Sequence, residues 1–546
     1  MASKLFATKP LSMLLEEMQG ENRLRRVLGP VQLTALGVGA IIGTGIFILT
    51  GVAAHDRTGP ALMLSFVVAG LACVFAALCY AEFAAMVPVA GSAYTYAYAT
   101  LGEMFAWIIG WDLILEYAVG SATVAHGWSA HFQEFIPIFH EGLSWIPAKI
   151  PAIFHSAPFN YCVSVGSGCP TTGFVRTDSY FDLPAILITF ILTVVLVKGI
   201  KESATFNAVM VGIKLIIVLM VIGIGIFFIK EANWHPFAPF GYTGISFFGH
   251  TLLGQTAKGG EPLGMFAGAA IIFFAYIGFD SVSVHSEEAK KPARDVPIGI
   301  IASLIICTIL YILVAGVLTG MVPAKDINID APVVDAFRRA GLVWMQYLVA
   351  AGAMTGITSV LLVMMLSQPR VMLALARDGL VPKGFFGDIH PKFRTPWKST
   401  ILTGLFVASM AGFIPLSILA EMTSIGTLFA FVIVCGAVLV MRKTNPNANR
   451  PFRAPFVPLV PILGILTCLL LMFSLPAENW YRLIIWLLIG FVIYFLYGRR
   501  HSVMNTQRNL EHELAAHGVG GQAVGDPDAP PSSPAAPIDT HVERDK

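Results

Sequence analysis

Apolar runs of about 20 residues recur along this chain and constrain its fold more than any other feature. The hydrocarbon core of a bilayer is about 30 Å thick, so a helix of about 20 apolar residues crosses it. Hydrophobic residues make up 56% of the 546 residues and charged residues only 12%, against about 25% charged in soluble domains. The sequence predicts an all-α polytopic membrane protein with about twelve transmembrane helices, at 33–49, 61–86, 105–133, 183–197, 204–229, 265–280, 297–321, 344–366, 400–415, 418–441, 456–475 and 481–497.

The distribution of lysine and arginine predicts the orientation of these helices. With the N-terminus inside, 25 of the 35 Lys and Arg residues fall in cytoplasmic segments and nine in outer segments. Positive charge gathers on the cytoplasmic side, so we expect a multi-pass protein of the inner (cytoplasmic) membrane with both termini in the cytoplasm. The net charge of +2 gives no sign of nucleic-acid binding.

The two terminal segments lack long apolar runs. Residues 1–32 are predicted to form a cytoplasmic N-terminal segment. Within it, 11–28 is predicted to be either an interfacial helix or a solvated segment that precedes the first transmembrane helix. Residues 499–546 form a cytoplasmic tail. Its last part is rich in Pro, Ala, Gly and Asp, a composition that predicts disorder.

Two of the apolar runs are interrupted by glycine at matching depths. Gly43 lies about 15 Å into the first run from the inside, and Ile277 lies about 18 Å into the sixth run from the outside. Open backbone in a membrane is tolerated where it lines a protein cavity. Equal depths reached from opposite directions indicate an inverted repeat of five plus five helices, 33–230 and 264–442, followed by two additional helices in 456–498.

The two breaks would offer opposite hydrogen-bonding groups to one ligand. Backbone N–H groups at the helix restart after Gly43 suit a carboxylate. Freed carbonyls before that break, and in the sixth helix, suit an ammonium. We therefore expect the α-groups of an amino acid to bind at these residues: Ile41, Ile42, Gly43, Thr44, Gly45, Phe274, Ala275 and Ile277. Phe274 is the expected lid. The alternative is that the glycines serve only tight helix packing.

Four ionisable residues lie deep within the predicted helices, and charge at that depth is costly. Lys214 is the one basic residue well inside a span. Asp112 and Glu116 are four residues apart and share a helix face. Glu116 and Asp280, which follows the second break, are expected to contact a cationic side chain or to carry a proton. Asp112 is expected at a gate; the alternative for all three carboxylates is a hydrogen-bonded cluster that closes the gate.

Three further predictions concern side chains near these helices. Glu82, close to many Lys and Arg residues, is expected in a cytoplasmic gate or loop ion pair. Met364 is expected to set the depth of the substrate pocket, or else to be ordinary core. Cys162 and Cys169 share a long outer loop and could pair or stay free. No metal-ligand cluster, nucleophile motif or phosphate-binding loop is evident, so neither a cofactor nor a metal is expected.

Several stretches together resemble the amino acid–polyamine–organocation superfamily, specifically a bacterial member of its cationic amino acid transporter branch. They lie at 37–47, 79–83, 88–98, 110–117, 274–280, 287–292, 295–300 and 377–380. The resemblance implies a LeuT-type fold and a secondary active transporter that works by alternating access. In sodium-coupled relatives an ion bridges helices 1, 5 and 8, and in proton-coupled relatives an ammonium on helix 5 replaces it. Lys214 matches that position, which implies proton coupling; its alternative role is to brace helix 1.

The expected function is therefore transport of L-amino acids, cationic ones first, rather than an enzymatic reaction. The expected partners are the substrate, the proton and the lipid bilayer, with room for a small accessory membrane subunit. Small neutral amino acids, facilitative uniport or exchange, and a non-transporting amino acid sensor are the alternatives.

Overall fold

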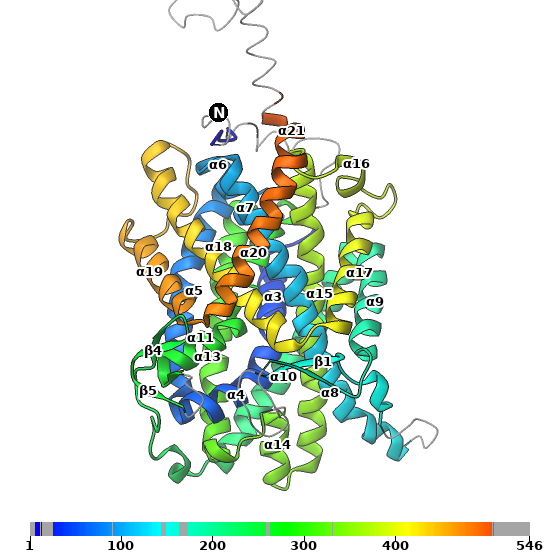
Figure 1. The fold of residues 1–546 in the computed structure, drawn as a ribbon, viewed down its shortest axis with the longest axis vertical. Helices are drawn as coiled ribbons and strands as arrows, with labels where there is room; N and C mark the ends of the chain where they lie inside the picture. Colours follow the sequence, from blue (N-terminus) through cyan, green and yellow to red (C-terminus); the bar gives the residue numbers. More distant parts are fainter. Residues whose placement is uncertain are drawn as a thin grey trace, which may run out of the picture.

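Long helices dominate the computed structural model, which describes residues 6–10, 13, 26–89, 91–142, 149–162, 173–257, 262–329, 331–504 and 506. The helices run roughly along the long axis of the molecule and form one bundle (Figure 1). Apolar sequences fold this way in lipid because a helix satisfies its own backbone hydrogen bonds. The predicted class, an all-helical polytopic membrane protein, is confirmed.

The longer helices follow the predicted apolar runs closely. They are α3 (Pro30–Ile41), α5 (Leu62–Met86), α7 (Glu103–Ile114), α8 (Gly120–Gly142), α9 (Leu183–Lys198), α10 (Ile200–Gly225), α11 (Met265–Ile272), α13 (Pro292–Met321), α15 (Val343–Arg377), α17 (Trp397–Phe413), α18 (Leu416–Thr444), α19 (Leu459–Ser474) and α20 (Ala477–Ile493). Further helices of the described chain have, like α11, eight residues or fewer: α4 (Thr50–Ala53), α6 (Ala93–Thr100), α12 (Ser281–Val284), α14 (Pro332–Arg339), α16 (Lys383–Phe386) and α21 (Arg499–His501).

Eight helical segments of the described chain are long and apolar enough to cross a membrane. They are Gly45–Met86, Glu103–Gln133, Thr205–Phe228, Met265–Val284, Pro292–Met321, Val343–Arg377, Ile418–Thr444 and Ala477–His501, and α3, α9 and α19 are shorter apolar helices. The count of twelve transmembrane helices stays a prediction.

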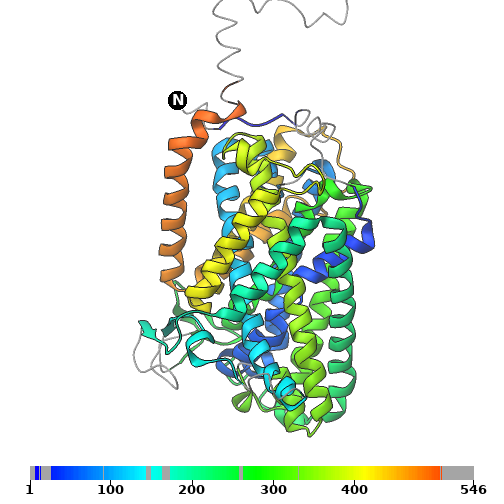
Figure 2. The same cartoon turned by 90° about the vertical axis from the view of Figure 1, so that its right-hand side faces the viewer.

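The two ends of the bundle carry different kinds of connection. At one end lie the short helices α6, α16 and α21 (Figure 1). The other end carries α14 and antiparallel hairpins, which also project from the bundle in the second view (Figure 2). The hairpins pair β1 (Phe159–Cys162) with β2 (Gly173–Arg176), β3 (Ile245–Phe247) with β4 (His250–Leu253), and β5 (Gln255–Thr256) with β6 (Pro262–Leu263).

Candidate functional site

The first predicted break is present between α3 and the next helical segment. The helix ends at Ile41, and Ile42 takes an extended conformation with φ −77° and ψ 105°. The chain then restarts as a short π-helix, η1 (Gly45–Leu49). A Cβ on Gly43 would lie 2.5 Å from Cγ2 of Val360, so only glycine fits against α15.

The second break divides the segment that begins with α11. After α11 the chain makes a tight 3₁₀ turn, η8 (Phe273–Tyr276), and Ile277 is extended with φ −59° and ψ 135°. Gly278 has φ +116°, a conformation that side chains disfavour, and α12 starts at Ser281. Both interruptions that the glycines predicted are therefore present in the backbone.

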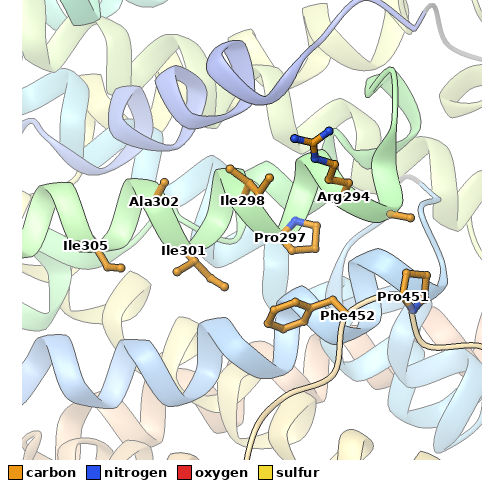
Figure 3. A pocket seen from close by; sticks show the side chains of 9 residues that line it. Arg294, Pro297, Ile298, Ile301, Ala302, Ile305, Pro451 and Phe452 are labelled. Carbon is orange, nitrogen blue, oxygen red and sulfur yellow. The ribbon is translucent and has the colours of Figure 1, made fainter.

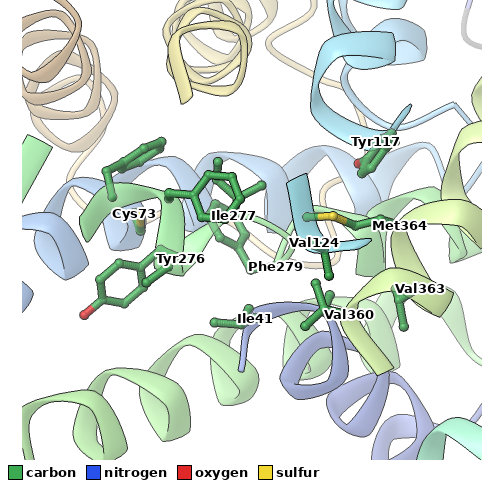
Figure 4. Packing of buried hydrophobic residues seen from close by; sticks show 14 of the residues in the cluster. Ile41, Cys73, Tyr117, Val124, Tyr276, Ile277, Phe279, Val360, Val363 and Met364 are labelled. Carbon is green, nitrogen blue, oxygen red and sulfur yellow. The ribbon is translucent and has the colours of Figure 1, made fainter. Parts of the chain in front are cut away.

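The two breaks lie against each other in the middle of the buried core. A Cβ on Gly45 would lie 2.3 Å from the Cβ of Ala275, and one on Gly278 would lie 2.8 Å from the Cβ of Ala40. Aliphatic side chains, among them Ile277, surround the contact (Figure 4). This close approach explains why both segments need glycine. Tight helix packing, the alternative role predicted for these glycines, is therefore also present at both breaks.

Tyr311 of α13 joins the two breaks, and it was not predicted from the sequence. Its hydroxyl lies 2.7 Å from the carbonyl oxygen of Ile41 and 2.8 Å from that of Ala275. The side chain is fully buried. The one hydroxyl proton lies between a carbonyl on each broken segment and can be donated to either, which removes part of the cost of opening a helix inside the membrane.

Lys214 of α10 lies directly beside the first break. Its ammonium donates to the carbonyl oxygens of Gly39 at 2.9 Å and Ile42 at 2.8 Å, and to Oγ of Ser359 at 2.7 Å. Ser359, on α15, also donates to Gly39 O at 3.1 Å. All three ammonium protons therefore have acceptors, and the lysine ties α3, α10 and α15 together. Ser359 was not singled out from the sequence.

The three predicted carboxylates are all buried, and most of their oxygens accept no hydrogen bond from any described residue. Both oxygens of Asp112, both of Glu116 and Oδ1 of Asp280 are in this state. The other oxygen of Asp280 accepts from the hydroxyl of Tyr117. A buried carboxylate without donors is costly unless it is protonated or meets a cation. The carboxylate oxygens without a partner can therefore still bind a proton or a cationic group.

Glu116 and Asp112 differ in their surroundings, although both face inward. Glu116 lies on a π-helical turn, η4 (Leu115–Val119), that interrupts the third predicted span; such turns are frequent at functional sites. Asp280 lies beside the same turn, because Tyr117, the residue after Glu116, donates its hydroxyl to Asp280. Asp112 is packed against α18, where a Cβ on Gly426 would lie 3.0 Å from its Oδ1.

The predicted lid and pocket residues lie in the core around the breaks. Phe274 is 6% exposed on η8, and Met364 is 1% exposed on α15. Met364 lies near Gly120, whose added Cβ would be 3.5 Å from the sulfur, and close to Val360 in Figure 4. The roles of lid and pocket floor stay predictions. Thr44, at the first break, has a buried hydroxyl without a partner among the described residues.

Glu82 near the end of α5 is held by two arginines. Arg442 of α18 donates to it through two nitrogens, at 2.7 Å and 2.9 Å, and Nε of Arg450 lies 3.3 Å from it. The backbone N–H of Ala454 donates to the same carboxylate at 2.7 Å. This cluster fastens α5 to the end of α18 and to the following loop.

A second group of ion pairs joins the segment after α12 to the last turns of α15. Glu287 pairs with Arg377 at 2.9 Å, and Glu288 pairs with Arg370 at 3.2 Å. Burial, with a smaller contribution from Arg370, lowers the pKa of His285 to about 3, so this neighbouring ring stays neutral at cellular pH. Ion pairs of this kind are expected at a cytoplasmic gate. The gate itself stays a prediction.

The candidate disulfide falls partly outside the described residues. Cys169 lies outside them, and so does the side chain of Cys162, so the disulfide is not tested. Within the described part of the chain, no group of three His, Cys, Asp or Glu side chains could hold a metal ion.

Interrupted helices that meet in the core of a polytopic helical bundle define a membrane transport protein as the class. A family model described as amino acid permease matches residues 28–498. The chain therefore belongs to the amino acid permease family, which confirms the resemblance and makes it an amino acid transporter rather than an enzyme.

Individual relatives cover almost the whole chain. It is 42% identical to a methylthioribose transporter of Bacillus subtilis, over 92% of this chain and 100% of the relative. It is 45% identical, with the same coverage, to a branched-chain amino acid permease of Bacillus subtilis. A vacuolar cationic amino acid transporter 4 of Arabidopsis thaliana is 32% identical over 89% of this chain and 94% of the relative.

Proposed function

We propose that this chain is a secondary active transporter of L-amino acids with a LeuT-type inverted repeat of five plus five helices and twelve transmembrane helices. The single observation that carries this proposal is the pair of broken segments, which abut at Gly45 and Ala275 and share the hydroxyl of Tyr311. Alternating access needs a central site between two repeats, and broken helices are where such sites are built.

The α-carboxylate of the substrate would bind at the N-terminus of η1. The first N–H groups of a helix have no acceptor within it, and they carry the positive end of its dipole. The unpartnered hydroxyl of Thr44 adds a side-chain donor at the same place. The α-ammonium would bind carbonyl oxygens of η8. The carbonyls of Ile41, Ile42 and Ala275 already accept from Tyr311 or Lys214, and that of Phe274 accepts from the N–H of Ile277. Each carbonyl oxygen has a second lone pair, with which it can also accept from the ammonium.

Proton coupling would act through Lys214. Its ammonium holds two carbonyls of α3 and a hydroxyl of α15, where a small cation would otherwise tie the same segments. Loss of its proton would weaken these three hydrogen bonds and loosen α3 from α10 and α15. We therefore propose inward proton flow as the driving force, with both termini in the cytoplasm.

Two substrate classes have specific support. The unused oxygens of Glu116 and Asp280 favour a cationic side chain. The aliphatic residues packed around the breaks favour a neutral side chain (Figure 4), and so does the relative named as a branched-chain amino acid permease. Cationic amino acids are the first candidate, because unpaired buried carboxylates are costly to keep without a partner.

Uptake into proteoliposomes tests the proposal. The purified chain should accumulate labelled arginine or leucine above the external concentration when an inward proton gradient is imposed, and protein-free liposomes should not. Arginine uptake that exceeds leucine uptake supports the cationic class, and the reverse supports the neutral class. Failure to take up either amino acid, with or without a gradient, would overturn the proposed function.

A further inference from the structure

An apolar groove runs along the outer face of α13, away from the two breaks. It has a volume of about 570 Å³. One wall is formed by successive turns of α13 and the other by the loop before α19 (Figure 3), and the residues that line it are Ala293, Arg294, Pro297, Ile298, Ile301, Ala302, Ile305, Pro451 and Phe452.

This face of α13 would lie against lipid, because α13 is long and apolar enough to cross a membrane and large apolar side chains are exposed on this face. Ile298 is 41% exposed and Ile305 is 50% exposed, although both are large and apolar. From Ala293 to Ile305 the helix rises about 18 Å, close to half of a hydrocarbon core of about 30 Å. The groove therefore has about the length of the acyl chains in one leaflet.

One end of the groove is lined by a cationic side chain, and three more cations lie nearby in sequence. Arg294 lines this end of the groove, and in Figure 3 its guanidinium points to the side of α13 opposite Pro451 and Phe452. Lys290, Lys291 and Arg453 are neighbours in sequence of the lining residues and are exposed, as Arg294 is. No described acidic side chain pairs with any of these four cations. The nearest acidic residue in sequence, Asp295, is buried and accepts instead from the backbone N–H of Lys291 at 3.3 Å.

We propose that this groove binds one anionic phospholipid, with its phosphate at Arg294 and the neighbouring cations and an acyl chain along Ile298, Ile301 and Ile305. The charge at the mouth complements a phosphodiester, and basic sites at the ends of transmembrane helices favour anionic headgroups. A soluble phosphate compound would leave the apolar wall unused, so a lipid is the better match. The proposed orientation places the headgroup in the cytoplasmic leaflet, and only this choice of leaflet rests on the proposed function.

Native mass spectrometry of the delipidated full chain tests the proposal. The probes are phosphatidylglycerol and phosphatidylcholine with the same acyl chains. Wild type should retain phosphatidylglycerol more tightly. Arg294→Gln should weaken that binding about fivefold, the effect expected of one cation at a lipid surface. The matched control is Lys383→Gln, because Lys383 is exposed on α16 and outside the groove; it should bind as wild type does.

A second variant tests the apolar wall without changing charge. Ala302→Trp fills the groove and should weaken retention of both lipids to a similar extent, while Arg294→Gln should weaken phosphatidylglycerol, which has a net negative charge, more than phosphatidylcholine. Equal retention of the two lipids by wild type, or equal behaviour of Arg294→Gln and Lys383→Gln, would overturn the proposal. The proposal would also be overturned if glycerol phosphate competed as strongly as the lipid does. Crosslinking of a small membrane polypeptide, and not of lipid, to Phe452 would overturn it as well. No transport is measured, so failure of the proposed function would not alter these results.

Discussion

At the scale of single residues, the carbonyls freed by the first break are held from two sides. Tyr311 donates to Ile41 O and Lys214 donates to the adjacent Ile42 O. The two side chains come from α13 and α10, which are far apart in sequence. Opening a helix in lipid leaves acceptors that must find donors, and here two buried side chains supply them.

Tyr311→Phe tests the first of these donors. The variant leaves two buried carbonyls without their hydroxyl, and we expect a loss of about 1–3 kcal/mol in the free energy of unfolding. Tyr242→Phe is the control, because Tyr242 is 56% exposed. The measurement is thermal or denaturant unfolding of both variants in the same detergent. Equal stability of the two variants would contradict a bridging role for Tyr311.

Lys214→Met tests the coupling role. Accumulation driven by a proton gradient should be lost, while exchange of labelled for unlabelled substrate should persist in the folded fraction. Lys198→Met, at the exposed end of α9, should keep both activities. Wild-type uptake that depends on sodium and ignores pH would refute the assignment, as would proton-driven accumulation by Lys214→Met.

Glu116→Gln tests the charge of the substrate. If arginine uses this carboxylate, its affinity should fall by at least about thirtyfold, the equivalent of about 2 kcal/mol for a buried charge pair. Leucine affinity should change little, since leucine has no cationic side chain. Glu231→Gln is the control in the same competition assay, because Glu231 is exposed at the start of the 3₁₀ helix η7 (Glu231–Trp234). Equal losses for arginine and leucine would assign Glu116 to the proton or the gate.

At the scale of elements, the helices were predictable and their partners were not. Apolar runs such as 344–366 mark helices because lipid leaves few other choices, and glycine marked both breaks because only glycine fits the observed approach at Gly43 and Gly278. Tyr311 could not be found this way, since a tyrosine in an apolar run gives no signal of its contacts. The short helices α6 and α14 were missed because they lie in connections outside the apolar pattern.

Gly43, at the first break, leads to a prediction about substrate binding by the broken segment. Gly43→Leu would place a side chain against Val360 and at the proposed carboxylate site, so substrate binding should be lost. Gly223→Leu is the matched control, because a Cβ on Gly223 would meet nothing within 4 Å. Binding of labelled amino acid to both folded variants is the measurement. Normal binding by folded Gly43→Leu would place the site elsewhere.

At the scale of the whole molecule, described segments near both ends of the chain meet at one end of the bundle. Lys9 pairs with Asp378 at 2.5 Å, and Tyr94 donates to the same carboxylate at 2.5 Å. Glu103 accepts from Tyr494 at 2.8 Å and from Ser502. These contacts join the N-terminal segment to the end of α15, and they join α7 to the last described helices. They lie on the side that the proposed orientation places in the cytoplasm.

Lys9→Met tests whether this junction stabilises the molecule. It removes a buried cation from Asp378, and breaking a buried pair costs about 3–5 kcal/mol. We expect faster proteolysis of the N-terminal segment and a lower unfolding temperature than for Lys383→Met, which removes an exposed lysine. Indistinguishable variants would show that the junction adds little.

Binding of an amino acid between the two broken segments would be seen most directly in an experimental structure of the chain with bound substrate. We expect ligand density between η1 and η8, with the carboxylate at the start of η1 beside Thr44. Ligand density confined to another region, such as the cavity near Asn328 and Tyr347, with the backbone of both breaks left empty, would contradict this expectation.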